Sequence, residues 1–290
     1  LRQLPVRLLI ADYTDSSKAK AMSLAMNATA DIPYDAVVIM DADNIAGTSF
    51  LSELNPVFQS GARAVQAHRT AKNTNTDIAV LDAASEEINN SIFRSGHIAL
   101  GLSSALIGSG MALEACWFRQ HIHLLETAGE DKEMEALLLK QRIHIEYLEH
   151  VYVKDEKKEG IKNQRKRWIA AQFDSLVRTL PDFPKELLRG NIDYCDKVFQ
   201  WTLLPRIILI FCTFFFTILV TLVSPYSSIK WWILAFALFL ALFTAIPGHL
   251  LNKQLLRAIF QLPSLLLGIA SNLFKLKGVN KKFIHTEHGN

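Results

Sequence analysis

The stretch AVVIMDAD, residues 36–43, decides how the first half of this chain is expected to fold. Its five apolar residues have the length and continuity of a parallel strand that is covered on both faces. The run ends in Asp41 and Asp43, and ligands of open α/β sheets bind beyond the carboxyl ends of such strands. The stretch therefore predicts a buried strand that carries two acids to the edge of a binding cleft.

Two carboxylates this close repel each other unless a cation or a hydrogen-bond donor offsets their charge. A hard divalent ion, Mg²⁺ or Mn²⁺, does this when one or two carboxylates hold it and substrate phosphates complete its shell. An ordinary Asp-rich turn continued by Asn44 is the other interpretation, and the local sequence leaves both open.

The sequence on either side alternates strand-like and helix-like segments up to about residue 200. Strands are expected at 6–11, 36–40, 62–66, 143–148 and 151–153, and helices at 17–28, 82–98 and 132–142. On the second helix, Asp82, Glu86 and Glu87 are expected to form a solvated face. This order predicts an α/β domain with a mostly parallel sheet over residues 1–200.

Composition narrows the class of protein further. Half of the 290 residues are apolar and 20% are charged, which excludes disordered, collagen-like and coiled-coil chains. A net charge of +3 gives no reason to expect a nucleic-acid partner. The three cysteines have neither metal-binding nor disulfide spacing and fit a reducing compartment.

Most of the apolar excess lies after residue 200, in two uncharged runs at 207–223 and 231–246. As a helix the first run rises about 25 Å, close to the roughly 30 Å hydrocarbon thickness of a bilayer. The runs predict two transmembrane helices within 201–247, with a buried hairpin of a soluble protein as the alternative. Residues 254–273 are amphipathic and broken, and lysines follow them. We therefore expect 248–290 to form an interfacial or re-entrant helix and a basic cytosolic tail.

Two further motifs offer groups for chemistry. Residues 129–131 (GED) directly precede an amphipathic helix, where Asp131 is either a helix cap or a general base for a substrate hydroxyl. Residues 164–168 (QRKRW) lie in a basic stretch ahead of the apolar runs. Such a stretch either binds anionic lipid or uses its arginines on a diphosphate, with Trp168 offering a flat face to a sugar.

The order of these features resembles the family 2 glycosyltransferases that are embedded in membranes. Cellulose, hyaluronan and poly-N-acetylglucosamine synthases belong to that group, and ceramide glucosyltransferase is a non-processive relative. The most specific element is Gln-x-x-Arg-Trp at 164–168; supporting stretches are Lys20-Ala21, residues 38–43, Val65-Gln66 and Gly108-Ser109-Gly110. The resemblance extends from about Lys18 to Val223 and implies a GT-A fold.

The resemblance also implies an inverting transfer from a nucleoside-diphosphate sugar, a UDP-sugar, to a growing polysaccharide or other glycan. Asp41 would lie near the nucleotide, Asp43 would bind Mg²⁺ or Mn²⁺ on the diphosphate, and Asp131 would be the catalytic base. The other substrate-binding residues would be Gln164, Arg165, Arg167 and Trp168 over the diphosphate and acceptor, and Gly108, Ser109 and Gly110 beside the acceptor.

In this interpretation the protein is a multi-pass protein of a cell membrane, such as a bacterial inner membrane, with the catalytic domain cytosolic. Its partners would be the sugar nucleotide, a glycan or lipid acceptor, the lipid bilayer and an accessory membrane subunit. Single-sugar transfer to a lipid and a degenerate, non-catalytic membrane protein are the alternatives. The family starts with a strand and a uracil-binding Asp ahead of the counterpart of residue 1, so we expect this chain to lack the start of the domain.

Overall fold

The computed structural model describes residues 6–11, 17–127, 129–157, 161–260 and 262, with the backbone alone for 161–167. The strands are β1 (Ala36–Ile39), β2 (Ile45–Ala46), β3 (Ala64–Ala71), β4 (Met111–Glu114) and β5 (Ile145–Asp155). The first helices are α1 (Lys18–Ala28), α2 (Phe50–Gln59), α3 (Asp77–Asn90), the π-helical turn η1 (Ser91–Ser95), α4 (Gly96–Ala99), α5 (Ala115–His121) and α6 (Glu130–Lys140). The later helices are α7 (Ile161–Thr179), α8 (Phe183–Leu188), α9 (Ile192–Thr202), α10 (Arg206–Val223), α11 (Pro225–Thr244) and α12 (Lys253–Ile259).

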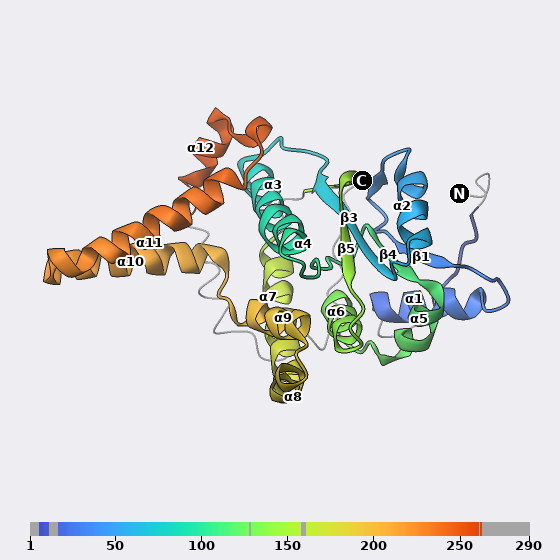
Figure 1. Cartoon of the computed structure of the whole chain (residues 1–290). Helices are drawn as coiled ribbons and strands as arrows, with labels where there is room; N and C mark the ends of the chain where they lie inside the picture. Colours follow the sequence, from blue (N-terminus) through green and yellow to red (C-terminus); the bar gives the residue numbers. More distant parts are fainter. Residues whose placement is uncertain (1–5, 12–16, 128, 158–160, 261, 263–290) are drawn as a thin grey trace.

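The five strands form one sheet in the order β1-β4-β3-β5-β2 (Figure 1). β3 and β5 run parallel, from the pair Ala64 and Ile145 to the pair Ala71 and Asp155, and the other three neighbouring pairs are antiparallel. The mixed α/β class is confirmed, but the expectation of a mostly parallel sheet is wrong. The reason is β4, which lies between β1 and β3 and runs against both.

β1 differs from the expected strand in its burial. It pairs only with β4 among the described residues, and three of its four residues are half-buried. Its apolar run therefore belongs to an end strand of the described sheet, not to one covered on both faces. Residues 6–11 contribute no strand, and Leu8 and Ile10 are exposed there.

Alternate residues of the strands enter two separate cores, as the two-residue period of a strand requires. Ala64 of β3 and Leu113 of β4 pack into the larger core, which also receives Trp117 and Leu138 from α5 and α6. Their strand neighbours turn to the opposite face, where α2 packs through Phe50 and Leu54. Helices thus cover both faces of the sheet.

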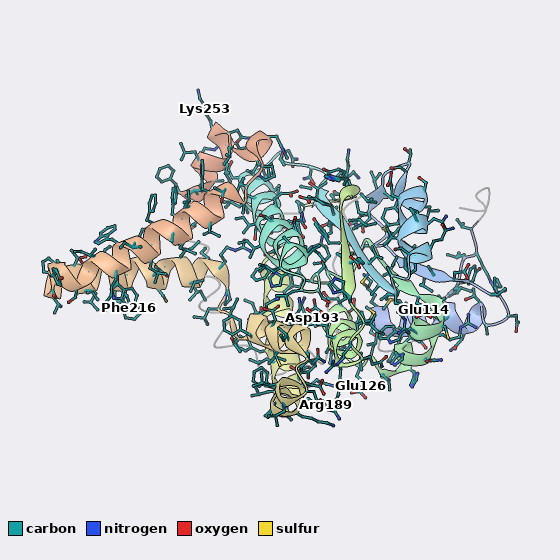
Figure 2. All side chains as sticks on the ribbon, in the orientation of Figure 1. Glu114, Glu126, Arg189, Asp193, Phe216 and Lys253 are labelled. Atoms are coloured by element: carbon teal, nitrogen blue, oxygen red, sulfur yellow. The ribbon has the colours of Figure 1, made fainter. Side chains whose placement is uncertain are left out.

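α10 and α11 form an apolar hairpin that extends away from the sheet and its helices (Figure 1). Both helices are long and apolar enough to cross a membrane, and only 11% of each apolar window is buried. Figure 2 shows side chains such as Phe216 projecting from the hairpin. The alternative of a buried hairpin is therefore wrong, and the two helices match the predicted runs closely.

α3 connects this hairpin and α12 to the sheet. Arg206, the first residue of α10, donates to the Ser85 carbonyl at 3.3 Å, and Arg257 of α12 forms an ion pair with Asp77 at 2.6 Å. Leu255 packs beside Val80 in a small apolar cluster. The predicted interfacial helix at 254–273 thus starts as a helix docked on α3; from residue 263 it lies outside the described residues.

Candidate active site

Lys18 joins two of the motifs that the sequence singled out. It is the first residue of α1, which Ser17 caps by accepting from the backbone N–H of Lys20. Its ammonium donates to Asp41 Oδ1 at 2.5 Å and to the carbonyl of Gly108 at 2.6 Å. The end of β1 and the loop ahead of β4 are therefore held together by one cation.

Asp131 lies directly beside the same junction. A Cβ built on Gly108 would be 3.8 Å from the Asp131 Cβ and 3.8 Å from the Lys18 ammonium. Gly108 has φ +80°, a conformation that suits glycine, so a side chain is excluded here by the backbone. Asp41, Gly108 and Asp131 thus converge, as the family resemblance predicts.

Glu130 is the second acid of this junction and is nearly buried. Burial, and after it the charge of Asp131, raises the pKa of Glu130 to about 7, while Lys18 acts in the opposite direction. The site therefore contains one carboxyl whose charge changes near neutral pH, next to Asp131.

The loop of residues 105–110 is fixed by side chains from several elements. Each of its six carbonyls accepts a side-chain N–H at 2.6 to 3.5 Å; in loop order the donors are Arg94, Lys132, Arg69, Lys18 and, for the last two carbonyls, Gln66. Gln66 is fully buried, and its Oε1 also accepts from the Ile107 N–H at 3.1 Å. These hydrogen bonds tie the loop to α1, β3, α6 and the helical turn η1.

Gly108, Ser109 and Gly110 are all buried, but they differ in which residues surround them. Ser109 is fully buried, and its Oγ has no hydrogen-bond partner in the part of the chain that the structure describes. A Cβ on Gly110 would meet Val153 at 3.1 Å. Only Gly108 faces Asp131 and Lys18, so substrate contacts of Ser109 and Gly110 stay predictions.

Asp43 lies on the turn that follows β1. Asn44 fixes this turn by accepting from the Asp41 N–H at 3.2 Å and donating to Asp155 Oδ1 at 3.2 Å. The described residues contain no group of three or more His, Cys, Asp or Glu side chains that could hold a metal by themselves. The carboxylate of Asp43 fits a Mg²⁺ or Mn²⁺ ion that takes most of its ligands from a diphosphate and water.

α7 contacts the start of α6 through Ala171, three residues after the QRKRW stretch. A Cβ on Gly129 would lie only 2.7 Å from the Ala171 Cβ, so the two helices touch two residues before Asp131. Trp168, one helical turn ahead of Ala171, is 45% exposed. The side chains of Gln164, Arg165 and Arg167 lie outside the described residues, and their roles stay predictions.

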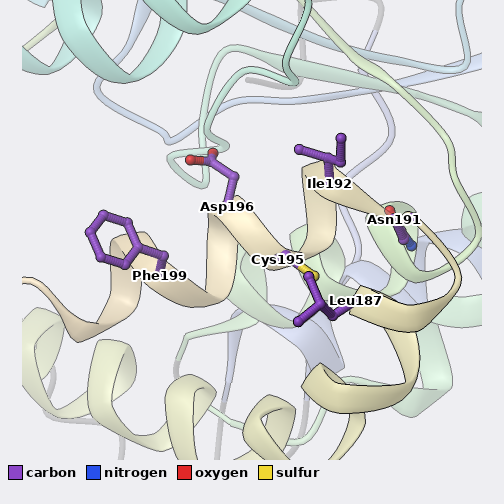
Figure 3. A pocket seen from close by; sticks show the side chains of 7 residues that line it. Leu187, Asn191, Ile192, Cys195, Asp196 and Phe199 are labelled. Atoms are coloured by element: carbon purple, nitrogen blue, oxygen red, sulfur yellow. The ribbon is translucent and has the colours of Figure 1, made fainter.

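A cavity of about 280 Å³ lies elsewhere, between α8 and α9 (Figure 3). Leu187, Ile192, Cys195 and Phe199 line it, and none of the predicted site residues does. Asn191 and Asp196 also line it, and the cavity is separate from the cluster of Lys18, Asp41 and Asp131.

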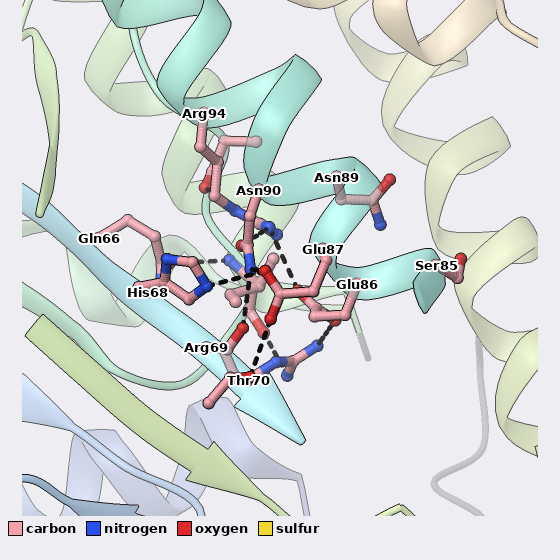
Figure 4. Close-up of polar contacts among 12 residues, drawn as sticks. Gln66, His68, Arg69, Thr70, Ser85, Glu86, Glu87, Asn89, Asn90 and Arg94 are labelled. Carbon is pink, nitrogen blue, oxygen red and sulfur yellow. Dashed lines mark hydrogen bonds and ion pairs between the residues drawn. The ribbon is translucent and has the colours of Figure 1, made fainter. Parts of the chain in front are cut away.

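The acids of α3 are not the solvated face that the sequence predicted. Glu86 and Glu87 are 7% and 5% exposed. Glu86 pairs with Arg69 at 2.8 Å and with Arg94 at 3.2 Å, and Glu87 accepts from His68 and Thr70 (Figure 4). Glu86 therefore anchors two of the arginines that hold the 105–110 loop, and Glu87 binds side chains of β3.

Sequence reasoning missed Lys18, Glu130 and the role of Gln66. One signal was available for Lys18, because a lysine in the first turn of a helix opposes the helix dipole and so needs another reason to be there. Glu130 lies in the first turn of α6, and nothing in the local sequence marks its burial. Gln66 lies in an otherwise apolar strand segment, a position where a polar side chain must have buried partners.

One comparison with known proteins identifies a family for this chain. The family model described as glycosyl transferase family group 2 matches residues 36–244, from the start of β1 to the end of α11. A search among curated proteins found no match.

Proposed function

Because the chain belongs to glycosyl transferase family group 2, we propose that it transfers a sugar from a UDP-sugar to a growing glycan at a membrane surface. The observation that carries this proposal is the meeting of Asp41, Gly108 and Asp131 around the Lys18 ammonium. An acceptor hydroxyl beside Gly108 would have the Asp131 carboxylate within reach. The turn with Asp41 and Asp43, proposed to bind the donor, would lie next to it. A GT-A arrangement of the domain is part of the proposal.

Asp131 is the general base in this mechanism. It takes the proton from the acceptor hydroxyl while that oxygen attacks the anomeric carbon, and the bond from that carbon to the diphosphate breaks on the opposite face. The product is a glycosidic bond of inverted configuration, a nucleoside diphosphate and a proton on Asp131. Gly108 matters because only a residue without a side chain leaves this approach open.

The donor side would be formed by two segments. Asp41 lies near the nucleotide, and Gln164, Arg165, Arg167 and Trp168 of α7 close over the diphosphate. Guanidinium groups stabilise the charge that grows on the departing diphosphate, an effect that dominates many transfer reactions. The contact of Gly129 with Ala171 supports this arrangement because it fixes α7 beside the base.

Asp43 is the residue that would hold Mg²⁺ or Mn²⁺, which when bound supplies positive charge to the diphosphate. A glycan acceptor and an accessory membrane subunit are consistent with a membrane location, which the two apolar helices support. The proposed orientation places the sheet domain and the α12 end of the hairpin in the cytosol.

The test is sugar transfer by membranes that contain the chain, measured with radiolabelled UDP-sugars. Asp131→Asn should abolish transfer and leave UDP binding with Mn²⁺ unchanged in a calorimetric titration, while Asp174→Asn is the surface control. Full transfer by Asp131→Asn would contradict the mechanism. Product size separates glycan extension from the alternative of single-sugar transfer to a lipid.

A further inference from the structure

α9 carries polar side chains on one face and ends directly before the apolar hairpin. Asp193, Lys197 and Gln200 recur at helical spacing, and only residues 203–205 separate the end of α9 from α10. Gln200 contacts His97 at 2.9 Å, and the neighbouring Asp196 pairs with the same imidazole at 3.2 Å. This face of α9 therefore points at the segment that leads into the 105–110 loop.

Lys197 reaches the loop through Glu135. Its ammonium is 3.1 Å from Glu135 Oε1, which also accepts the Leu106 N–H at 3.0 Å. Glu135 is fully buried and Lys197 is 2% exposed. Burying the charges of Lys197 and Glu135 costs desolvation free energy. Their ion pair and hydrogen bonds offset that cost only when the two groups are well placed.

Asp193 binds Ser103, which lies two residues ahead of the 105–110 loop. One carboxylate oxygen accepts the Ser103 N–H at 2.7 Å, and the other accepts the Ser103 hydroxyl at 2.7 Å. The Ser103 hydroxyl is in turn 3.2 Å from the Ile145 N–H, which donates to it. Asp193 thus links α9 to Ser103 and to the first residue of β5.

We propose that Asp193 and Lys197 are positioning residues that hold the 103–110 loop, and with it Gly108, against Asp131 from the helix that adjoins the hairpin. This inference rests on the proposed function for its effect on transfer. Neither side chain reaches Gly108 or Asp131 by a direct hydrogen bond, so both act through the loop. The hairpin and the site are then linked by one helix face.

The test compares Lys197→Met and Asp193→Asn with Lys140→Met and Asp182→Asn. The control pair makes the same type of contact at 2.6 Å, but on the surface, with 45% and 35% exposure. In both α9 variants we expect kcat for transfer to fall about 10-fold or more, because small displacements of a positioned group cost that much. The Kd of UDP with Mn²⁺ should stay within about twofold of wild type, because neither side chain belongs to the proposed donor site. A tenfold weaker Kd, which is about 1.4 kcal/mol of binding free energy, would indicate damage to the donor site.

Hydrogen exchange gives a second measurement that does not depend on catalysis. The amides of Ser103 and Leu106 donate to the two carboxylates, so a peptide covering 101–110 should exchange faster in both α9 variants and not in the controls. Unchanged exchange and wild-type kcat would overturn the inference, as would a parallel loss of UDP affinity and kcat. Faster exchange with no transfer by the wild-type chain would reject the proposed function and support the positioning contacts. If Lys197→Met does not fold, Asp193→Asn, at a partly exposed position, decides the outcome.

Discussion

Gly129→Ala is the substitution that separates two of the converging motifs with the least chemical change. Gly129 has φ −110°, which alanine adopts readily, so only space opposes the new methyl group. That methyl would lie 2.7 Å from the Ala171 Cβ. Carbon atoms rest at about 3.5–4.0 Å, so α6 and α7 must move apart by about 1 Å.

We expect this separation to cost about 1–3 kcal/mol of stability, as overpacking does. If Asp131 is the base and α7 binds the diphosphate, as proposed, a displacement of about 1 Å between them should lower transfer about 100-fold. The assay is transfer kcat together with the thermal unfolding midpoint in detergent. The variant Gly129→Ala with Ala171→Gly moves the methyl from one helix to the other, so it should regain most of the lost kcat, although glycine inside α7 costs about 1 kcal/mol. Wild-type kcat in Gly129→Ala would refute the reasoning, and so would a double variant no better than the single one.

Three other predictions concern the same junction. Glu130 has its pKa raised from 4.5 to about 7, so the stability it contributes is complete below pH 4.5 and is lost as the pH rises through 7. Glu130→Gln should therefore remove about 3 kcal/mol of pH dependence between pH 5 and pH 8.5 in denaturant midpoints, and an unchanged pH profile would contradict this. Lys18→Met leaves Asp41 uncompensated where the donor is proposed to bind, and it should raise the Kd of UDP about tenfold by calorimetry. Lys140→Met on the surface is the control, and equal Kd values for the two variants would reject the role of Lys18. Gln66→Met removes the hydrogen-bond partner of four backbone groups, so it should destabilise the domain by about 3 kcal/mol or more in thermal unfolding. A near-neutral change would contradict this role of Gln66.

The apolar helices and the start of α6 could be predicted from the sequence because their signals are local. Seventeen uncharged residues in a row predict a long apolar helix whatever surrounds them, and Gly129 with two acids marks a helix start. The order of the motifs, compared with a family, then indicated that Asp41, Gly108 and Asp131 share one site. The structure places the three residues close together, and their functional roles stay predictions.

Strand direction could not be predicted because the two-residue period of a strand is the same in parallel and antiparallel sheets. The apolar run at 36–40 looks like a covered strand, yet β1 lies at the end of the described order. The polar residues Glu149 and His150 divided residues 143–153 into two predicted strands, but they occupy exposed positions within the single strand β5. Both errors have the same cause: the position and length of a strand depend on the strands beside it, which the local sequence does not reveal.

The buried charges were also beyond prediction from sequence. Glu86 and Glu135 lie on amphipathic helices where acids ordinarily face water. Each is buried beside basic partners. Glu86 pairs with Arg69 of β3 and with Arg94 of the helical turn that follows α3, and Glu135 pairs with Lys197 of α9. The Arg69, Arg94 and Lys197 contacts help to hold the 105–110 loop, and no spacing rule connects them.

The central claim is that the turn after β1, the start of α6 and the start of α7 surround one sugar nucleotide. An experimental structure of the full chain in lipid nanodiscs with UDP and Mn²⁺ tests it directly. We predict density for the nucleotide beside Asp41, with the metal at Asp43 and the diphosphate touching Arg165 or Arg167, within one sugar's length of Asp131. UDP bound in the cavity between α8 and α9, or at any position out of reach of both Asp41 and α7, would contradict the account.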